Sequence, residues 1–245
     1  MKRAPVLVLC KTETTVDAVL QRLGEGAPSA LAEGRIFIGK KRAASSDPVR
    51  TGDEIWMYPP REAPRNAPRI LLEQDGVVAV DKPPDMATVA DHRGAAGSLE
   101  AEVAKMLGGK TVLTATSRLD VGVSGVVLLA ADEDARRRLA KARDEGQYLR
   151  HYVAIASRAP SPKSGTWSSP IGRAKNPRLR QAGGASAVRA ETLYTIAAET
   201  PKGALLAVEP QTGRTHQIRV HAAHAGCPLW GDEPYGGPTG FVAAN

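Results

Sequence analysis

Residues 111–131 read TVLTATSRLDVGVSGVVLLAA, and this stretch holds the pattern that decides the fold. Residues 111–116 and 126–131 are apolar runs of strand length, and a polar loop with two glycines separates them. We therefore expect two strands joined by a loop that carries Asp120. From the residue pattern alone, Asp120 is either a turn residue, which is the favoured interpretation, or a carboxylate positioned for chemistry.

Ser124 lies in the same loop and raises an alternative function, that of a serine hydrolase. The nucleophile elbow of that class needs the pattern Gly-x-Ser-x-Gly, but position 126 is valine. The pattern therefore disfavours a hydrolase, and a fluorophosphonate probe that fails to label the protein would discount it.

Further periodic runs flank this region and predict the fold class. Apolar and β-branched runs predict strands at residues 70–72, 77–80, 148–157, 188–197 and 204–209, with Asp75-Gly76 as a hairpin turn. Caps and glycines predict helices from Ser98 to Leu107, from Asp132 to about Arg143 and from near Thr215 to Gly226. In the first helix the residues expected to face the core are Leu99, Val103, Met106 and Leu107. Because strands and helices do not alternate strictly, the pattern indicates an α+β fold rather than a doubly wound sheet.

A proline-rich stretch at residues 59–69 predicts an extended linker, since such a run fits neither a helix nor a central strand. It separates a small α/β domain, residues 1–58, from a larger domain, residues 70–245. In the small domain we expect strands at 6–9, 35–38 and 55–58 and a helix at 15–23, with Val16, Val19, Leu20 and Leu23 on one apolar face. The turn after its second strand carries three cations, Lys40, Lys41 and Arg42, which form either a solvated loop or a phosphate contact.

The composition restricts the class of partner. The chain has 245 residues with a formal net charge of +7, and its basic residues cluster in short patches that would attract a nucleic acid. No apolar run is long enough to cross a membrane, and the first apolar stretch is too short for a signal peptide, so we expect a cytoplasmic protein. The two cysteines and the missing glycine-rich fingerprints predict neither a disulfide, a zinc site nor a nucleotide cofactor.

Residues 211–224, QTGRTHQIRVHAAH, place several polar groups on one expected helix. His221 and His224 would share a face, but no third metal ligand follows at suitable spacing, so packing or RNA contact is favoured. Arg219 stands beside an apolar residue and can point inward, where an arginine needs a carboxylate partner. Tyr152, on the expected strand 148–157, is either a packing residue or a platform for a base.

Three motifs together resemble the pseudouridine synthases of the RluA type. In the family's order, they are Ser117-Arg118-Leu119-Asp120 with Ser124-Gly125, then Tyr152, then Thr212–His221. The opening Asp81-Lys82-Pro83-Pro84 and the closing Gly231-Asp232 with Tyr235-Gly236 are also similar, so the resemblance covers about residues 69–236. Residues 32–38 and 52–55 resemble a small ribosomal-protein-like RNA-binding module that precedes this domain in many such enzymes.

The resemblance implies a mostly antiparallel central sheet with flanking helices and a central cleft. It also implies an enzyme that extracts a uridine from structured RNA, ribosomal RNA more than transfer RNA, and isomerises it without a cofactor or metal. Asp120 matches the essential carboxylate, Arg219 an arginine that pairs with it, and Tyr152 the tyrosine that packs on the uracil. The residues matched to substrate contacts are Arg118, Arg214, His216 and Gln217. A monomer is the expected state.

Several positions depart from the family pattern. Ser117 replaces the usual histidine, residues 121–123 replace an Arg-Asp-Thr run, and Arg150 replaces a lysine. The chain also stops soon after Gly237, where relatives continue, so we expect a shortened or differently covered sheet edge. These losses support one alternative function, a catalytically degenerate protein that binds RNA or assists ribosome assembly.

Overall fold

The computed structural model describes residues 5–60 and 66–239 and divides the chain into two compact units, Met1–Asp144 and Glu145–Asn245. The predicted linker at residues 59–69 falls partly on residues 61–65, which lie outside the described residues. The predicted division into residues 1–58 and 70–245 therefore stays a prediction.

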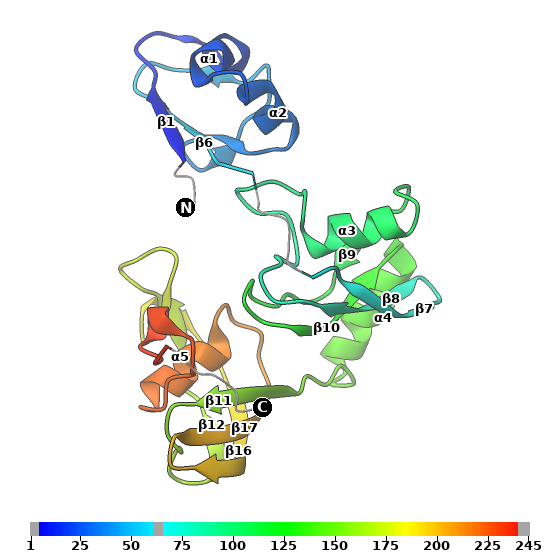
Figure 1. The fold of residues 1–245 in the computed structure, drawn as a ribbon, viewed down its shortest axis with the longest axis vertical. Coiled ribbons are helices and arrows are strands. Elements are labelled where there is room, and N and C mark those ends of the chain that lie inside the picture. The colour runs from blue at the N-terminus through cyan, green and yellow to red at the C-terminus, as the bar shows by residue number, and fades with distance from the viewer. Residues whose placement is uncertain (1–4, 61–65, 240–245) are drawn as a thin grey trace. The chain divides into compact units, whose positions relative to one another are not determined.

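The first part of unit 1 is a small sheet packed against two helices (Figure 1). The sheet has the order β1-β6-β3-β4, with β1 (Val6–Leu9), β6 (Glu54–Met57), β3 (Ile36–Ile38) and β4 (Lys41–Arg42). A second pair joins β2 (Thr14–Thr15) and β5 (Pro48–Val49), and the helices are α1 (Val16–Leu23) and α2 (Ala27–Ala32). The predicted helix face is confirmed, because Val16, Val19, Leu20 and Leu23 are buried against Ile36 and Ile55.

The rest of unit 1 is built around the sheet that carries the Asp120 loop. Its order is β7-β8-β10-β9, with β7 (Arg69–Gln74), β8 (Val77–Lys82), β10 (Gly125–Ala130) and β9 (Thr114–Ala115), all antiparallel. Helix α3 (Leu99–Met106) packs Leu99 and Val103 into the core of this sheet, and α4 (Glu133–Asp144) follows β10.

The turn and cap predictions in this part are confirmed. Asp75 and Gly76 join β7 to β8 with φ values of 49° and 73°, the left-handed conformation that a tight hairpin requires. The Ser98 hydroxyl accepts from Ala101 N, and an Asp132 carboxylate oxygen accepts from Ala135 N, so both side chains cap their helices.

Two predictions in unit 1 are wrong in detail. The strand expected at 111–116 shortens to β9, because Thr114 pairs with Ala130, the last residue of β10, and the residues before Thr114 extend beyond that strand. Met106 is 52% exposed, because it is the last residue of α3 and lies past the buried stripe of Leu99 and Val103.

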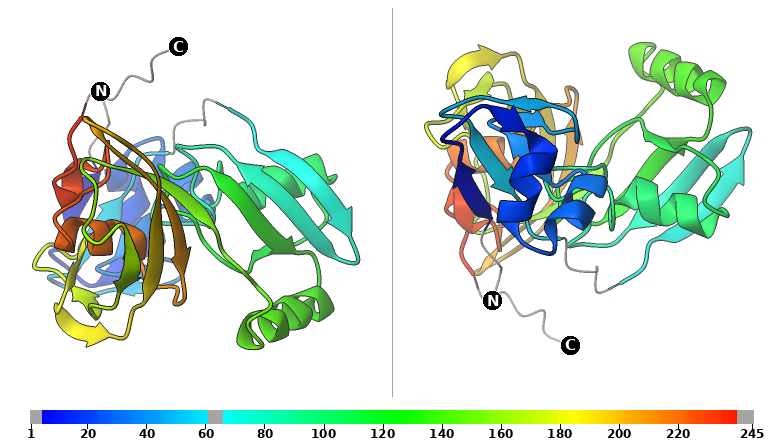
Figure 2. Two further views of the ribbon diagram at one scale, coloured as in Figure 1. Left: turned by 90° about the horizontal axis from the view of Figure 1, so that it is seen from below. Right: turned by 90° about the horizontal axis from the view of Figure 1, so that it is seen from above.

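The described residues of unit 2 form two antiparallel sheets, one α-helix and one short 3-10 helix. The four-stranded sheet β11-β17-β16-β12 consists of β11 (Tyr152–Ala156), β17 (Gly203–Pro210), β16 (Thr192–Thr200) and β12 (Ser164–Trp167). The three-stranded sheet β14-β13-β15 consists of β14 (Arg180–Ala182), β13 (Ile171–Arg173) and β15 (Ala185–Val188). Helix α5 (Gln217–His224) packs Ile218 and Ala222 against Leu206 and Val208 of β17, and the short 3-10 helix η1 (Glu233–Tyr235) follows (Figure 2).

Three boundaries in unit 2 differ from the prediction. The strand expected at 148–157 is limited to β11, which pairs with β17 only from Tyr152 onward. The strand expected at 188–197 is two strands, because the chain leaves one sheet after Val188 and enters the other at Thr192. Helix α5 begins after His216, which has φ 59°, and not at Thr215.

The predicted fold class is confirmed as α+β with mostly antiparallel sheets and few helices. The strands beyond the proline-rich stretch belong to separate sheets in the two units, so the single central sheet and the cleft implied by the resemblance stay predictions.

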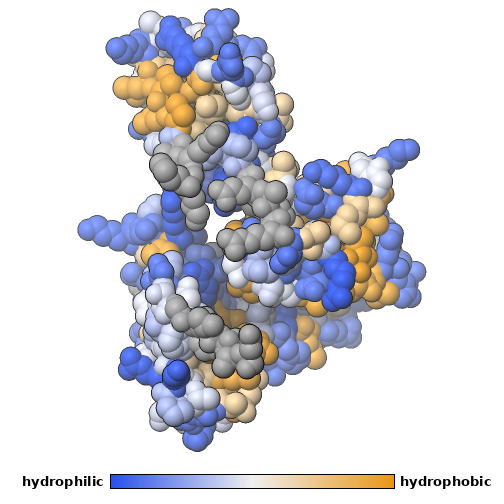
Figure 3. Space-filling model, viewed as in Figure 1, coloured by the Kyte–Doolittle hydropathy of each residue, from blue (hydrophilic) through white to orange (hydrophobic). Residues whose placement is uncertain are grey.

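Hydrophobic side chains on the surface gather over β1 (Figure 3), where Val6, Leu7 and Leu9 are 44–58% exposed. Among the described residues, no helix is both long and apolar enough to span a bilayer. Helix α4 carries the acidic Glu133 and Asp134 in its first turn and the basic Lys141 and Arg143 in its last turn.

Candidate active site

The loop between β9 and β10 holds Asp120 in a defined backbone position. Both backbone groups of Leu119 bind the buried Thr88 hydroxyl, which donates to Leu119 O at 2.9 Å and accepts from Leu119 N at 3.1 Å. The Leu119 side chain packs against the core of the sheet, and Val123 N donates to Asp120 O at 3.0 Å to close a turn. The half-buried Asp120 is thus flanked by fixed main chain.

Lys82 supports the same loop from the end of β8. Its side chain is fully buried, and its Nζ donates to Pro83 O at 2.9 Å, Met86 O at 2.8 Å and Val121 O at 3.4 Å. Burial lowers the pKa of Lys82 from 10.5 to about 8, while the negative charges of Asp120 and Asp85 act in the opposite direction. A buried cation therefore lies in the electrostatic reach of the predicted catalytic carboxylate.

Lys82 has no role in the site predicted from the sequence, although the sequence carries a signal for one. Residues alternate along β8, so that Val78, Val80 and Lys82 are buried on one face. A lysine at the third position of a buried alternating face needs hydrogen-bond acceptors close by. The alternation along β8 therefore predicts a supporting contact of Lys82 at the end of the strand.

The other residues of the Asp120 loop are more open to solvent. Arg118, a predicted substrate contact, is exposed two residues before Asp120. Ser124 is also exposed. The predicted roles of Asp120 and Arg118 stay predictions.

Arg219 in unit 2 has a carboxylate partner, as a half-buried arginine requires. Its Nε donates to Asp232 Oδ2 at 2.8 Å and its Nη2 to Asp232 Oδ1 at 2.6 Å, a bidentate pair. The guanidinium carbon also lies 4.8 Å from the centre of the Tyr235 ring. The side chains of Arg219 and Asp232 are only 22% and 9% exposed, so the pair fixes α5 to the segment around η1. The predicted pairing of Arg219 with Asp120 joins different units and stays a prediction.

Tyr152 is the first residue of β11, opposite Val208 of β17. It is half-buried and packs against the core that contains Val208 and Leu206. Arg150, two residues before Tyr152, donates from Nη2 to Pro210 O at 2.9 Å and so connects the start of β11 to the end of β17. The role of Tyr152 at the uracil stays a prediction.

A buried hydrogen-bond network shapes the segment before α5. Gln217 Oε1 accepts from the Thr212 hydroxyl at 2.7 Å and from Arg214 N at 2.9 Å. Its Nε2 donates to Glu191 O and to the Thr192 hydroxyl, both at 2.9 Å. Gln217 is buried and both ends of its amide are engaged, so it organises this segment, and its predicted substrate contact stays a prediction.

The network continues through His221. Its Nδ1 lies 2.9 Å from the Thr192 hydroxyl and its Nε2 lies 2.9 Å from Ser169 O, an acceptor, so the neutral ring carries its proton on Nε2. Burial lowers the pKa of His221 and favours this neutral form. Packing is thereby confirmed for His221, whereas His224 is exposed. The described residues contain no group of three or more potential metal ligands.

The remaining predicted contacts lie at different places in the two units. His216 is half-buried, with Nδ1 2.7 Å from the Tyr235 hydroxyl, and Arg214 is exposed. Lys40 is exposed in the turn between β3 and β4, Lys41 Nζ contacts Asp47 Oδ1 at 3.0 Å, and Arg42 Nη2 donates to Asp91 O at 3.0 Å. Two of these three cations therefore have partners within unit 1, and their contact with RNA stays a prediction.

Known proteins with similar sequences and folds identify the family. The profile of the RNA pseudouridylate synthases matches residues 76–224, which is more than half of the chain. An uncharacterized RNA pseudouridine synthase of Chlorobaculum parvum is 33% identical over 231 residues, which cover 86% of this chain and 70% of that protein. A Mycobacterium bovis protein with the same description is 33% identical over 243 residues, which cover 90% and 78%.

The fold points to the same class of RNA-modifying enzyme. The structure of human RNA pseudouridylate synthase domain containing 4 has a TM-score of 0.58 and 27% sequence identity to this chain, covering 71% of it and 73% of the human chain. The chain belongs to the RNA pseudouridylate synthase family, in its RluA-type branch. It is an RNA pseudouridine synthase, an isomerase whose substrate is RNA.

Proposed function

We propose that this enzyme isomerises a specific uridine in structured ribosomal RNA and that Asp120 is its catalytic carboxylate. The observation that supports Asp120 is the fixed loop around it, which Thr88 and Lys82 hold at Leu119 and Val121. A reacting group needs such a defined position, because small displacements cost large factors in rate. The preference for ribosomal over transfer RNA rests on the resemblance of residues 1–58 to a ribosomal-protein-like module.

In the proposed reaction the target base leaves the RNA stack and enters a pocket. The ionised Asp120 then attacks the ribose or the uracil ring, or it assists formation of a glycal. The glycosidic carbon–nitrogen bond breaks, the uracil rotates, and a bond forms between the ribose carbon and ring carbon 5, whose proton leaves. The ring nitrogen gains a proton, so the atoms balance without any co-reactant.

Two residues of unit 2 complete the proposed site. Tyr152 packs on the uracil, and its hydroxyl assists removal of the proton from the ring carbon. Arg219 orients the ionised carboxylate of Asp120 while it is itself held by Asp232. Water must be excluded while the glycosidic bond is broken, because hydrolysis would release the base.

The experiment that tests this proposal compares RNA from a strain that lacks the gene with RNA from the parent strain. Pseudouridine-specific chemical labelling should show a position in ribosomal RNA that loses its modification. The purified enzyme should restore that position in RNA from the deletion strain. A missing position in transfer RNA alone would contradict the ribosomal assignment.

The altered loop at Ser117 and residues 121–123 motivates a second candidate, a degenerate protein that binds RNA without modifying it, although the comparisons do not favour it. That candidate predicts no lost pseudouridine in any RNA of the deletion strain and no restoration by the purified protein. The retained Asp120, Tyr152 and Arg219 support the enzyme instead.

We also propose a cytoplasmic monomer, and light scattering of the purified protein would test the monomeric state.

A further inference from the structure

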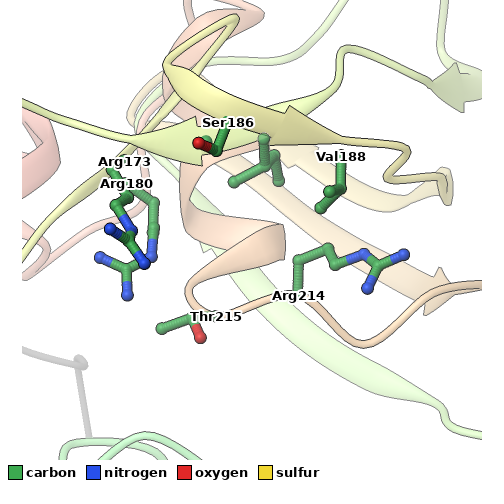
Figure 4. Close-up of a pocket in the computed structure, with 8 residues that line it drawn as sticks. Arg173, Arg180, Ser186, Val188, Arg214 and Thr215 are labelled. Atoms are coloured by element: carbon green, nitrogen blue, oxygen red, sulfur yellow. The ribbon is translucent and has the colours of Figure 1, made fainter.

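A basic pocket lies in unit 2 between the three-stranded sheet and the segment before α5. It encloses about 210 Å³, and its lining includes three arginines, one from β13, one from β14 and one from the loop after β17: Arg173, Arg180 and Arg214. Figure 4 shows the guanidinium groups of Arg173 and Arg180 beside each other, with Thr215 below them and Arg214 on the other side of Thr215. The hydroxyl-bearing residues Ser186 and Thr215 also line the pocket.

The pairing of β13 with β14 places two of these charges directly opposite each other. Arg173 and Arg180 are cross-strand partners in the antiparallel register. Like charges at such positions destabilise a sheet unless another group neutralises them. Among residues 5–60 and 66–239, no carboxylate lies within salt-bridge distance of Arg173, Arg180 or Arg214. An anion bound between Arg173 and Arg180 would therefore relieve a repulsion that no carboxylate of the described residues relieves.

The side chains of two of the arginines, Arg180 and Arg214, are held by main-chain carbonyls. Arg180 Nη1 donates to Leu179 O at 2.8 Å and to Pro177 O at 3.2 Å, and Arg180 N donates to the Tyr235 hydroxyl at 3.0 Å. Arg214 Nε donates to Arg189 O at 2.9 Å, and its backbone amide donates to Gln217 Oε1. These contacts engage one side-chain nitrogen of Arg180 and one of Arg214, and a guanidinium has five N–H groups in all.

The Tyr235 hydroxyl connects this pocket to the neighbourhood of Arg219. It accepts from Arg180 N and lies 2.7 Å from His216 Nδ1, while the ring of the same tyrosine packs on Arg219. A group bound at the arginines would therefore lie in the same unit as the Arg219–Asp232 pair, one side chain away from it.

We propose that Arg173 and Arg180, with Thr215 beside them, bind a backbone phosphate of the RNA substrate. A phosphodiester offers acceptor oxygens that match the planar donors of adjacent guanidinium groups, and hydroxyls such as those of Thr215 and Ser186 commonly contact RNA phosphates. The inference rests on the proposed function in that the anion belongs to RNA. It adds a contact that anchors the RNA strand and leaves the chemical step to other residues.

The test uses the full-length protein and in vitro transcribed ribosomal RNA in filter binding over about 50 to 200 mM salt. We expect the double variant Arg173→Gln/Arg180→Gln to bind about tenfold more weakly at low salt and to lose about one unit of the log–log salt slope, the amount for one phosphate. The matched control is Arg136→Gln/Arg137→Gln, which removes the same charge from arginines of α4 that already contact Glu133 and Asp134. The control should change neither the affinity nor the slope appreciably.

Two further readouts separate an RNA contact from other roles. The Arg173→Gln/Arg180→Gln variant should unfold at the same or a higher temperature, because the repulsion between the strands is removed. Titration with inorganic phosphate tests the other source of the same anion. Phosphate binding that the double variant abolishes, with unchanged RNA affinity, would overturn the proposal in favour of a small-anion site. Equal losses of RNA affinity in the double variant and the control would overturn it in favour of general charge attraction.

Failure of this inference can be distinguished from failure of the proposed function. If the wild type restores pseudouridine and the double variant keeps both RNA affinity and KM, only the phosphate site is wrong. If the double variant loses RNA affinity but the wild type modifies no uridine, the phosphate site stands and the proposed activity is wrong. With both correct, the double variant should raise KM about tenfold with little change in kcat.

Discussion

Replacement of Lys82 by methionine tests whether a buried ammonium supports the Asp120 loop. Methionine preserves the unbranched shape but removes the three hydrogen bonds that Nζ donates to main-chain carbonyls. In the folded protein the pKa of Lys82 is lowered from 10.5 to about 8, with burial as the main cause. The folded state therefore releases this proton at a lower pH than the unfolded state does.

The lowered pKa of Lys82 determines whether its contribution to the free energy of unfolding rises or falls with pH. Between pH 8 and 10.5 the unfolded chain holds the proton of Lys82 and the folded chain does not, so this residue adds stability as the pH rises. The contribution changes by about 1.4 kcal/mol per pH unit within that window, which gives about 2 kcal/mol between pH 7.5 and 9.5. The stability that Lys82 adds at high pH is lost as the pH falls through its folded pKa of about 8.

The assay is urea unfolding of the wild type and of Lys82→Met at about pH 7.5, 8.5 and 9.5, which lie on both sides of the folded pKa of about 8. The free energy of unfolding of the wild type should rise by about 2 kcal/mol relative to the variant over this range. Lys110→Met, at an exposed position, is the control and should show a flat difference. A flat difference for Lys82→Met as well would refute the buried ammonium. At pH 7.5 we also expect a fall in kcat of up to about 10²-fold, because the loop that carries Asp120 loses its contact at Val121.

Other predictions address unit 2. Arg219→Ala should lower the free energy of unfolding by about 2 kcal/mol, because Asp232 is left buried and unpaired; the loss stays moderate since Arg219 is itself partly open to solvent. The variant should also lower the rate of pseudouridine formation. Unchanged stability in urea unfolding together with an unchanged rate would exclude a buried ion pair that supports the site. The pKa of His221 is lowered by burial, so its contribution to stability is present above about pH 6.5 and is lost as the pH falls. Urea unfolding at decreasing pH should therefore show the wild type losing stability relative to His221→Gln, and parallel curves would contradict it. Tyr152→Phe should keep its packing and its fold by circular dichroism but lose about 10–10²-fold in rate; normal turnover by Tyr152→Ala would show that no stacking role exists.

Local chemistry made several features predictable from the sequence. The Asp75-Gly76 hairpin and the caps at Ser98 and Asp132 depend on residues adjacent in the chain, and the structure confirms them. The apolar face of α1 depends on a single helical period and is also confirmed. These elements need no knowledge of the rest of the fold.

Features that depend on distant parts of the chain were not predictable in the same way. The need of Arg219 for a carboxylate followed from its position, but its contact with Asp232 depends on the turn that brings η1 to α5. The division of the strand expected at 188–197 depends on which sheets accept β15 and β16. The start of α5 after His216 depends on Gln217, whose side chain binds Arg214 N and the strand residue Thr192.

In the candidate site, too, the sequence predicts which residues take part but not the distant residues that hold them in place. The family motifs locate Asp120, Tyr152 and Arg219 residue by residue, but they do not say what holds each residue in place. The supporting contacts of Thr88 and Lys82 come from a segment about 30 to 40 residues earlier in the chain, as their separations of 31 and 39 residues show. Such contacts become visible only when the fold brings the segments together.

The central claim is that Asp120 performs the chemistry, and substitution by asparagine tests it most directly. Asn keeps the size of the side chain and can keep its backbone contacts, but it cannot supply an ionised carboxylate. Purified wild type and Asp120→Asn would each be incubated with RNA from the deletion strain, and pseudouridine would be quantified by chemical labelling. We predict full restoration by the wild type and none by Asp120→Asn at equal RNA binding and equal thermal stability, whereas near-normal turnover by the asparagine variant would contradict the account.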